Sequence, residues 1–244
     1  WADENGFERK RNFMIQISNL SKKYGETVVF SDLNYTFENA CIYGLVGRNG
    51  AGKTTLLNIL SNYDKNYTGV ISIDRKKMNK VDYLDMPVAY AMDQPSFFNE
   101  LTIYENLLLI ASSRKIKKQE AFDKIERILD GLGLKKYENY SPLELSKGTM
   151  QRLNNACAMI QEEKITIFDE PFSGLDPVQM KLLENVIVEF HKKEKGIYII
   201  SSHDIECLQN VCDKCLLLHN GQIREINMEE VDREEIAKIL SEGE

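Results

Sequence analysis

Hydrophobic and polar positions predict strands in two separate parts of the chain. Residues 15–20 alternate in the manner of a half-buried strand, and residues 28–37 continue with a β-rich composition. Shorter strands are expected over residues 42–46, 69–74 and 88–92. Continuous apolar runs, which are typical of strands buried on both faces of a parallel sheet, follow at residues 165–168 and 197–200.

Between these two sets of strands the apolar residues recur at helical spacing. The spacing predicts helices over residues 103–111, 121–132 and 148–160. A further helix is expected from Pro177, which suits a first helical turn, with Asp176 as its N-cap. Near the end, residues 216–226 predict a hairpin that turns at Asn220-Gly221. The whole pattern indicates an α/β core interrupted by a helical insertion.

Composition and charge exclude several classes of protein. The 244-residue chain has a formal net charge of −7, which argues against a nucleic-acid-binding protein because such proteins carry a basic face. No apolar run approaches the roughly 20 residues needed to cross a bilayer, so membrane association is expected only through a partner. Residues 1–13 lack the apolar segment of a signal peptide and are expected to be a disordered leader or a remnant of expression.

Five cysteines in a chain without an export signal indicate a reducing cytoplasm. Cys207, Cys212 and Cys215 lie close together in the sequence and could suggest a metal site. A zinc site needs four ligands, however, and only His219 lies nearby. We therefore favour packing of these side chains over metal binding.

A glycine-rich loop follows the expected strand over residues 42–46. Residues 47–54, Gly-Arg-Asn-Gly-Ala-Gly-Lys-Thr, fit the pattern G-x-x-x-x-G-K-[ST] and precede an expected helix. The glycines let successive backbone N–H groups turn toward phosphate, and the helix start adds its positive dipole end. Lys53 is expected to reach the β- and γ-phosphates of a nucleotide, and the Thr54 hydroxyl to bind Mg²⁺.

An acidic pair follows another expected strand, residues 165–168. This strand carries Asp169 to the carboxyl edge of the sheet, where α/β proteins bind their ligands. Asp169 is expected to hold Mg²⁺ through water, and Glu170 to polarise the attacking water. An acidic pair after a strand is ordinary by itself, and the glycine-rich loop is what makes this one a candidate active site.

Through these two motifs and the further ones below, the chain resembles the ATP-binding cassette (ABC) ATPases from about residue 14 to residue 225. Tyr24 is similar to the aromatic residue that stacks on adenine in this family, and Gln94 to the glutamine that contacts Mg²⁺ and the attacking water. Residues 145–149, Leu-Ser-Lys-Gly-Thr, occupy the place of the family signature Leu-Ser-Gly-Gly-Gln. Residues 173–176 match the loop that crosses to a partner subunit, and His203 matches the histidine that contacts the γ-phosphate.

The resemblance implies a P-loop NTPase core of the RecA-like type with a mostly parallel sheet. It also implies an N-terminal antiparallel β subdomain and an α-helical subdomain inserted at about residues 95–160. The ATPase domain is expected over residues 14–225, with a helical tail over residues 226–244, and the implied cofactors are ATP and Mg²⁺. The implied catalytic residues are Lys53, Gln94, Glu170 and His203, and the metal ligands are Thr54, Gln94 and Asp169. The implied nucleotide-binding residues are Tyr24, Gly47, Arg48, Asn49, Gly50, Ala51, Gly52, Lys53, Thr54, Thr55, Ser146, Lys147 and Gly148.

The signature segment implies a site shared between two chains. Ser146 is expected to cap the following helix, which then aims its N–H groups at an anion. In the family that anion is the γ-phosphate held by the other subunit, so two copies or two paralogues face each other head to tail. Lys147 and Thr149 depart from the family signature. Lys147 either strains a backbone that only glycine reaches or adds a cation beside phosphate, and we favour the second alternative.

Three functions fit these residues. We expect the energy subunit of a transporter, docked on a separate transmembrane permease at the cytoplasmic face of the membrane. The alternatives are a soluble ABC ATPase that serves a cytosolic machine such as iron–sulfur cluster assembly, and a nucleotide-responsive regulatory subunit with little turnover. The short chain, without an acidic-glycine motif before the signature, resembles the separate cassettes of export and antibiotic-resistance systems.

Overall fold

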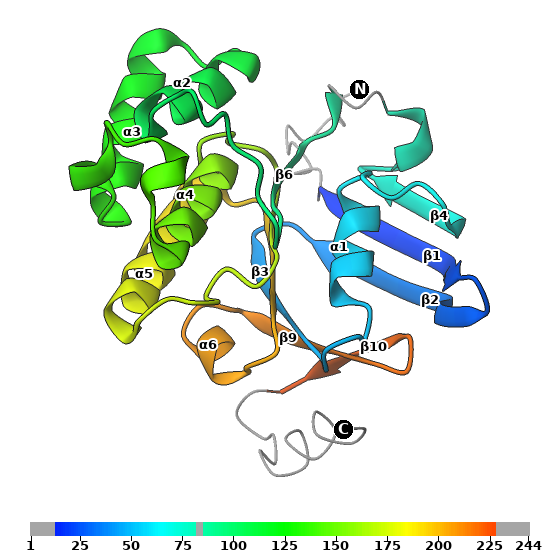
Figure 1. The fold of residues 1–244 in the computed structure, drawn as a ribbon. Helices are drawn as coiled ribbons and strands as arrows, with labels where there is room; N and C mark the ends of the chain where they lie inside the picture. Colours follow the sequence, from blue (N-terminus) through cyan, green and yellow to red (C-terminus); the bar gives the residue numbers. More distant parts are fainter. Residues whose placement is uncertain (1–12, 82–84, 228–244) are drawn as a thin grey trace, which may run out of the picture.

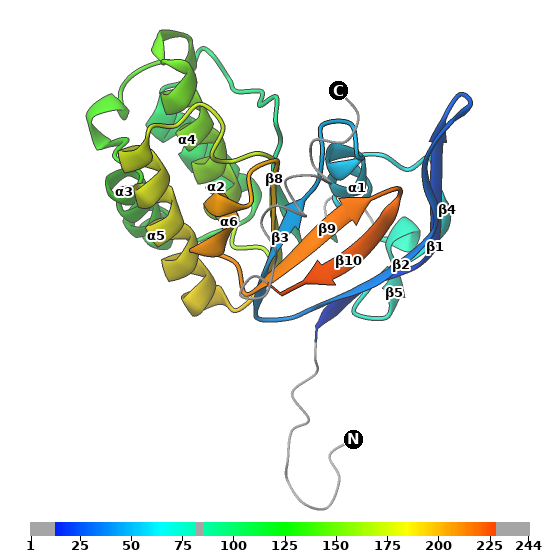
Figure 2. The ribbon, with the colours of Figure 1, turned by 90° about the horizontal axis from the view of Figure 1, so that it is seen from below.

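Two β-sheets form the framework of the structure, a computed structural model that describes residues 13–81 and 85–227 (Figures 1 and 2). The smaller sheet is antiparallel, with strand order β2-β1-β4-β5. Its strands are β1 (Met14–Tyr24), β2 (Thr27–Glu38), β4 (Thr68–Ile73) and β5 (Lys76–Lys77). The predicted N-terminal antiparallel sheet is therefore confirmed.

The larger sheet has strand order β10-β9-β3-β8-β7-β6. Every neighbouring pair in it is parallel except β9 with β10. Its strands are β3 (Cys41–Val46), β6 (Val88–Ala91), β7 (Ile165–Phe168), β8 (Ile197–Ser202), β9 (Lys214–His219) and β10 (Gln222–Ile226). Asn220 and Gly221, both with positive φ, form the predicted turn between β9 and β10.

The helices lie on both faces of the larger sheet, as Figures 1 and 2 show. Helix α1 (Lys53–Leu60) lies between the two sheets. The opposite face is covered by α2 (Ile103–Ser113), α3 (Lys118–Gly131), α4 (Lys147–Met159) and α5 (Pro177–Glu194), with the short α6 (Glu206–Gln209) nearby. The helices predicted from apolar spacing are confirmed. Within the described residues, no helix has the length and apolar character needed to cross a bilayer.

Alternate residues of the parallel strands enter two separate cores. On β8, Tyr198 and Ile200 pack toward the helices α2–α5, whereas Ile197 and Ile199 pack toward α1 and the antiparallel sheet. All four side chains are fully buried. The continuous apolar run over 197–200 is thus explained by burial on both faces.

Local side-chain hydrogen bonds cap the starts of two helices, α2 and α5. Asp176 accepts a hydrogen bond of 2.8 Å from the backbone N–H of Gln179, and so caps α5 as predicted. At the start of α2, Thr102 and Glu105 exchange side-chain and backbone hydrogen bonds in a capping box. These caps fix where α2 and α5 begin.

The two ends of the chain each differ from the expected picture in one respect. Phe13, placed by us at the end of the leader, is buried in the core, with the Lys164 ammonium 5.1 Å from the centre of its ring. The correction follows from packing, because an aromatic ring at this position covers the edge of the core. The tail is predicted over residues 226–244, but Ile226 is the last residue of β10. The remaining leader residues and residues 228–244 of the predicted tail lie outside the described residues.

The cysteines near the C-terminal hairpin pack against apolar neighbours. Cys215 is buried on β9, and a β-carbon at Gly44 would lie 3.0 Å from the Cys212 sulfur. Burial raises the pKa of the Cys215 thiol to about 12, as befits a packing residue. The described ranges contain no cluster of three or more metal-ligating side chains.

A buried lysine connects the helical insertion to the end of α5. The Lys124 ammonium on α3 lies 2.6 Å from Glu162 Oε1 and 3.5 Å from Glu194 Oε1. Glu194 also accepts a hydrogen bond of 2.5 Å from the Tyr198 hydroxyl. Burial lowers the pKa of Lys124, and its acidic partners oppose that shift.

Replacing this lysine tests whether the ion pair holds the insertion in place. We expect Lys124→Met to lower the free energy of unfolding by about 3 kcal/mol, because it leaves the Glu194 carboxylate buried without its cation. Adding Glu194→Gln should recover part of the loss, since the amide removes the charge and still accepts from Tyr198. Chemical denaturation of the three proteins measures both effects. Unchanged stability of the single variant would contradict this account.

Candidate active site

The carboxyl ends of three neighbouring strands assemble the candidate site. Strand β8 lies between β3 and β7 and pairs in parallel with both. The glycine-rich loop follows β3, the acidic pair follows β7, and His203 follows β8. Because parallel strands end at the same sheet edge, the topology alone brings these distant segments together.

The backbone of the glycine-rich loop requires glycine at two close approaches. A β-carbon at Gly47 would lie 2.8 Å from the carbonyl oxygen of Leu218, and one at Gly52 would lie 2.6 Å from a methyl carbon of Val29. Gly50 and Gly52 also have φ values of 80° and 99°, which favour glycine. These glycines allow a compact loop directly before α1, which begins at Lys53. This geometry suits a phosphate group at the helix start.

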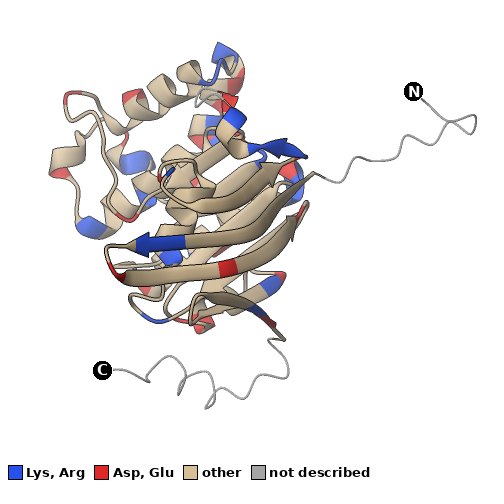
Figure 3. Cartoon of the chain, turned by 90° about the vertical axis from the view of Figure 1, so that its right-hand side faces the viewer, with Lys and Arg blue, Asp and Glu red and all other residues tan. Residues whose placement is uncertain are grey.

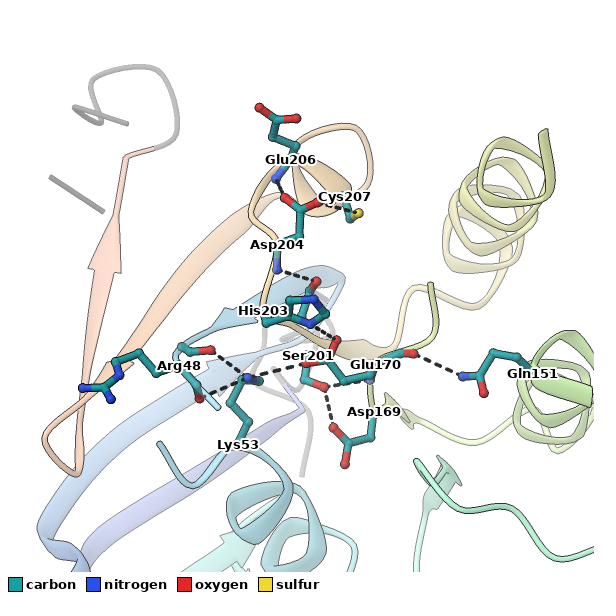
Figure 4. Close-up of polar contacts among 12 residues, drawn as sticks. Arg48, Lys53, Gln151, Asp169, Glu170, Ser201, His203, Asp204, Glu206 and Cys207 are labelled. Atoms are coloured by element: carbon teal, nitrogen blue, oxygen red, sulfur yellow. Dashed lines mark hydrogen bonds and ion pairs between the residues drawn. The ribbon is translucent and has the colours of Figure 1, made fainter. Parts of the chain in front are cut away.

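Lys53 lies beneath this loop with its ammonium inside the site (Figure 4). Its Nζ atom donates to the carbonyl oxygens of Gly47 at 2.7 Å and Arg48 at 3.3 Å. It also lies 3.5 Å from Glu170 Oε1. The only full positive charge brought to the loop by α1 therefore lies between the loop backbone and the acidic pair, where it can neutralise phosphate oxygens.

Asp169 is 1% exposed and is held by hydroxyl groups. Ser201 Oγ donates to Asp169 Oδ1 at 2.5 Å, and the Tyr90 hydroxyl lies 3.4 Å from Oδ2. Burial raises the pKa of the Asp169 carboxyl, while hydrogen bonds from Ser201 and Thr54 oppose this shift. The hydrogen bond to Thr54 joins the two side chains expected to hold the metal. A hydroxyl and a carboxylate are oxygen ligands of the kind that Mg²⁺ prefers, so these residues fit the ion.

Glu170 has a strained backbone that is fixed on both sides. Its φ is 49°, in the left-handed region that is unfavourable for glutamate. Its N–H donates to Ser201 Oγ at 2.9 Å, and its carbonyl oxygen accepts from Gln151 Nε2 of α4 at 3.2 Å (Figure 4). Its carboxylate Oε2 lies 3.0 Å from Nδ1 of His203. The fixed backbone therefore places the Glu170 carboxylate next to both His203 and Lys53.

Most of the predicted nucleotide-binding residues line one cleft of about 540 Å³. The predicted residues on its wall are Tyr24, Arg48, Asn49, Gly50, Gly52, Lys53, Thr54, Thr55, Glu170 and His203. The cleft is also lined by Thr27, Val29, Asp93 and Ser173, which were not predicted to bind the nucleotide. Gly47, Ala51 and Asp169 lie in the adjoining loop and strand end, behind the wall.

Gln94 and the signature residues are not brought to this cleft. Gln94 is exposed in the loop after β6, which is tied to α4 by a hydrogen bond of 2.7 Å from Asn154 Nδ2 to the carbonyl oxygen of Met92. Among the described residues that line the cleft, none comes from 146–148. Their roles remain predictions that require movement of a loop or a second chain.

The signature segment begins α4 and packs on the loop over residues 173–176. Ser146 Oγ accepts from the Thr149 N–H at 3.2 Å, as an N-cap does. A β-carbon at Gly148 would lie 2.9 Å from the carbonyl oxygen of Gly174, which explains the glycine. Lys147 is the first residue of α4 and lacks a positive φ, so the strained alternative is wrong for this position.

Two hydroxyl groups of the site were missed from the sequence. Ser201 joins Asp169 to Glu170, and the Tyr90 hydroxyl lies 3.0 Å from Asn58 Oδ1 of α1 as well as near Asp169. Both belong to otherwise apolar strands, and a hydroxyl near the carboxyl end of such a strand is the signal that could have found them.

The fold and the site together define a P-loop ATPase. The ABC transporter family model matches residues 30–173, and the chain belongs to this family. An uncharacterised ABC transporter ATP-binding protein of Methanocaldococcus jannaschii is 32% identical over 208 residues, covering 85% of this chain and 75% of its own. The bacitracin transport ATP-binding protein of Enterococcus faecalis is 30% identical, covering 91% and 71%. The tungstate uptake ATP-binding protein of Peptoclostridium acidaminophilum is also 30% identical, covering 86% and 97%.

Solved structures agree with this assignment. The ATP-binding subunit of an ABC transporter superimposes with a TM-score of 0.81 at 27% identity, covering 94% of this chain and 95% of its own. A dimeric ABC transporter cassette, 23% identical, shares the fold with a TM-score of 0.77. The chain is an ATP-binding subunit of the ABC transporter family and an ATP hydrolase.

Ser201 offers a direct test of how the two acidic residues are held. We expect Ser201→Ala to lower kcat for ATP hydrolysis by about tenfold or more, because one hydroxyl serves both the Asp169 carboxylate and the Glu170 N–H. Steady-state kinetics of the purified chain measure the change. Ser202→Ala, a neighbouring buried hydroxyl that accepts from the Asp204 N–H, is the matched control and should stay within about twofold. Equal losses in both variants would refute the role of Ser201.

Proposed function

We propose that this chain binds and hydrolyses Mg-ATP at a head-to-tail interface with a second cassette and so powers transport by a separate transmembrane permease. The observation that carries the proposal is the position of residues 146–148. They start α4, where backbone N–H groups favour an anion, yet they lie outside the chain's own cleft. A second copy or a paralogue would supply the phosphate that this helix start can bind.

The chemistry proposed for the cleft is transfer of the γ-phosphoryl group of ATP to water. The oxygen of the attacking water bonds to the γ-phosphorus while the bond from that phosphorus to the bridging oxygen breaks, which releases ADP and phosphate. Glu170 accepts a proton from the attacking water, and His203 Nδ1 orients the glutamate carboxylate at 3.0 Å. Lys53 neutralises charge on the β- and γ-phosphate oxygens.

Mg²⁺ belongs to the same proposal. Thr54 and Asp169 would hold it, and Gln94 is proposed to reach both the ion and the attacking water from the loop after β6. When bound, the ion supplies positive charge to the phosphate oxygens. Because the Gln94 loop is tied to α4 through Asn154, such a movement would be transmitted to the helical insertion.

Release of the dimer is proposed to follow hydrolysis. The loop over residues 173–176 packs on the start of α4, so the segment that crosses to the partner and the helix that meets the partner's phosphate move as one unit. ADP offers this helix no terminal phosphate, and the attraction between the two copies is then lost. A binding event at a phosphate is in this way converted into opening and closing.

A patch of exposed apolar side chains supports a permease partner. Phe98, Tyr140 and Leu143 are 59%, 45% and 75% exposed. Ser141 Oγ donates to the Asn99 carbonyl at 2.8 Å, which brings the two loops that carry these residues together. Large exposed apolar side chains gathered in one place mark surfaces that meet other proteins or membranes. We name Phe98, Tyr140 and Leu143 the loop patch.

The direction of transport is left open by the relatives. The bacitracin transport protein and the tungstate uptake protein are each 30% identical to this chain. The proposal therefore covers energising a permease in either direction, at the cytoplasmic face of the membrane.

Lys, Arg, Asp and Glu are interspersed on the side of the antiparallel sheet in Figure 3, where no single-sign band appears over the described strands.

Glu170→Gln tests the shared active site. We expect turnover to fall by about 100-fold or more, because the amide cannot accept a proton from water. ATP should still bind, so nucleotide-bridged dimers should accumulate and appear in size-exclusion chromatography with light scattering. Glu189→Gln, an exposed carboxylate on α5, is the control and should leave turnover and mass unchanged. A variant that hydrolyses ATP normally, or stays monomeric with ATP bound, would count against the proposal.

Affinity purification from native membranes tests the partner. We expect the chain to bring down a polytopic membrane protein, and Phe98→Ser combined with Leu143→Ser to abolish this while ATPase activity persists. Val28→Ser, which changes an apolar residue of similar exposure on β2, should retain the partner. Recovery of soluble iron–sulfur assembly proteins instead of a membrane protein would favour the alternative cytosolic function.

A further inference from the structure

A buried ion pair lies directly behind the aromatic ring at the outer end of the cleft. Tyr24 ends β1 and is 51% exposed on the cleft wall. The Lys22 ammonium lies 4.5 Å from the centre of the Tyr24 ring and 2.7 Å from Asp64 Oδ2. The Tyr24 hydroxyl donates to the same Asp64 oxygen at 3.1 Å. The ring is thus held at its face by a cation and at its tip by a carboxylate.

The positive charge of Lys22 is not needed for packing of the antiparallel sheet. Lys22 is only 4% exposed, and a buried ammonium is costly unless its charge is paired and its N–H groups are satisfied. Its Nζ meets that need with Asp64 and with the carbonyl oxygen of Asn66, at 2.7 Å. An apolar side chain would fill the same space without this requirement, so the charge calls for a role besides burial.

The Asp64 carboxylate is already occupied by donors of the protein. Oδ2 receives Lys22 Nζ and the Tyr24 hydroxyl, and Oδ1 receives the N–H of Asn66 at 2.9 Å. A carboxylate with three donors has little capacity left for a ligand. Asp64 therefore acts through the tyrosine and lysine rather than by touching a nucleotide.

The same aspartate is attached to the helix that starts at the phosphate loop. The backbone N–H groups of Tyr63 and Asp64 both donate to the carbonyl oxygen of Asn58 in α1, at 2.9 and 3.0 Å. Helix α1 begins at Lys53, beside the glycine-rich loop. The Tyr24 ring and the phosphate loop are consequently tied to opposite ends of one short helix, which fixes the distance between them.

We propose that Lys22 and Asp64 are positioning residues that hold the Tyr24 ring in place for the nucleotide base. The inference rests on the proposed function, together with the expectation from the family resemblance that Tyr24 stacks on adenine. A cation over one face of the ring attracts its π-electrons and immobilises it, and the exposed face is left for the base. The pair fixes both the tilt of the ring and its distance from the phosphate loop.

The test separates the base from the phosphates with two probes, ATP and inorganic tripolyphosphate. Their dissociation constants are measured by isothermal titration calorimetry on the full chain. Lys22→Met and Asp64→Asn should each weaken ATP binding about fivefold, and Tyr24→Ala about tenfold or more, with tripolyphosphate affinity unchanged. In steady-state kinetics, the weaker binding of ATP should appear as a higher KM, with kcat unchanged. Lys22→Arg, which keeps the cation, should restore most of the affinity for ATP.

Controls distinguish positioning from a loss of stability. Lys124→Met removes another buried, paired lysine, and its ratio of ATP to tripolyphosphate affinity should stay at the wild-type value. Should Asp64→Asn fold poorly because Lys22 is left unpaired, the double variant with Lys22→Met removes both charges and is measured instead. Equal weakening of both probes would overturn the positioning role, because the effect would then be structural.

The remaining outcomes separate this inference from the proposed function. Weaker ATP binding in Tyr24→Ala, with normal binding in Lys22→Met and Asp64→Asn, would overturn the positioning role and leave the stacked base intact. Normal ATP binding in Tyr24→Ala would remove Tyr24 from the base site, and the inference would fall with it. ATP hydrolysis and dimer formation would still stand or fall on Glu170.

Discussion

One hydroxyl group on the central strand of three holds the chemistry of this molecule together. Ser201 on β8 donates to the Asp169 carboxylate and accepts from the Glu170 N–H, so it fixes both acidic residues at once. The positive φ of Glu170 is tolerated because this hydrogen bond and that from Gln151 leave its backbone no alternative. The proposed metal ligand and the proposed water-activating group therefore share one support, and a shift of β8 against β7 would disturb both.

A second constraint sets the distance between the Tyr24 ring and the phosphate loop. Helix α1 carries Lys53 at its start, and its end holds Asp64 through the carbonyl of Asn58. Tyr90 touches the same residue from the strand side, because its hydroxyl donates to Asn58 Oδ1 and lies near Asp169. Asn58 thus contacts both the proposed base end and the proposed metal end of the site, and both depend on the position of α1.

The parts of this architecture that follow local rules could be predicted from the sequence. The alternation of strands, the caps at Asp176 and Ser146, the glycine-rich loop and the acidic pair each depend on neighbours a few residues away. Ser201 and the pair of Lys22 with Asp64 could not, because their partners lie tens of residues distant and are chosen by strand register and by where α1 ends. The sequence does not distinguish Lys22 from Lys23, and only the fold shows that Lys22 is the buried one.

The proposed division of the site between two chains would couple hydrolysis to mechanical work. The groups proposed to act on phosphate belong to the edge of the parallel sheet, whereas Ser146 and Gly148 belong to the helical insertion and lie outside the cleft. Gln151, one turn further along α4, nevertheless donates to the Glu170 carbonyl. The helix that we propose meets the partner's phosphate therefore also contacts Glu170, the proposed catalytic base of this chain. Closure at one interface would adjust the geometry at the other, and two cassettes arranged head to tail would sense each other's nucleotide through the same helix.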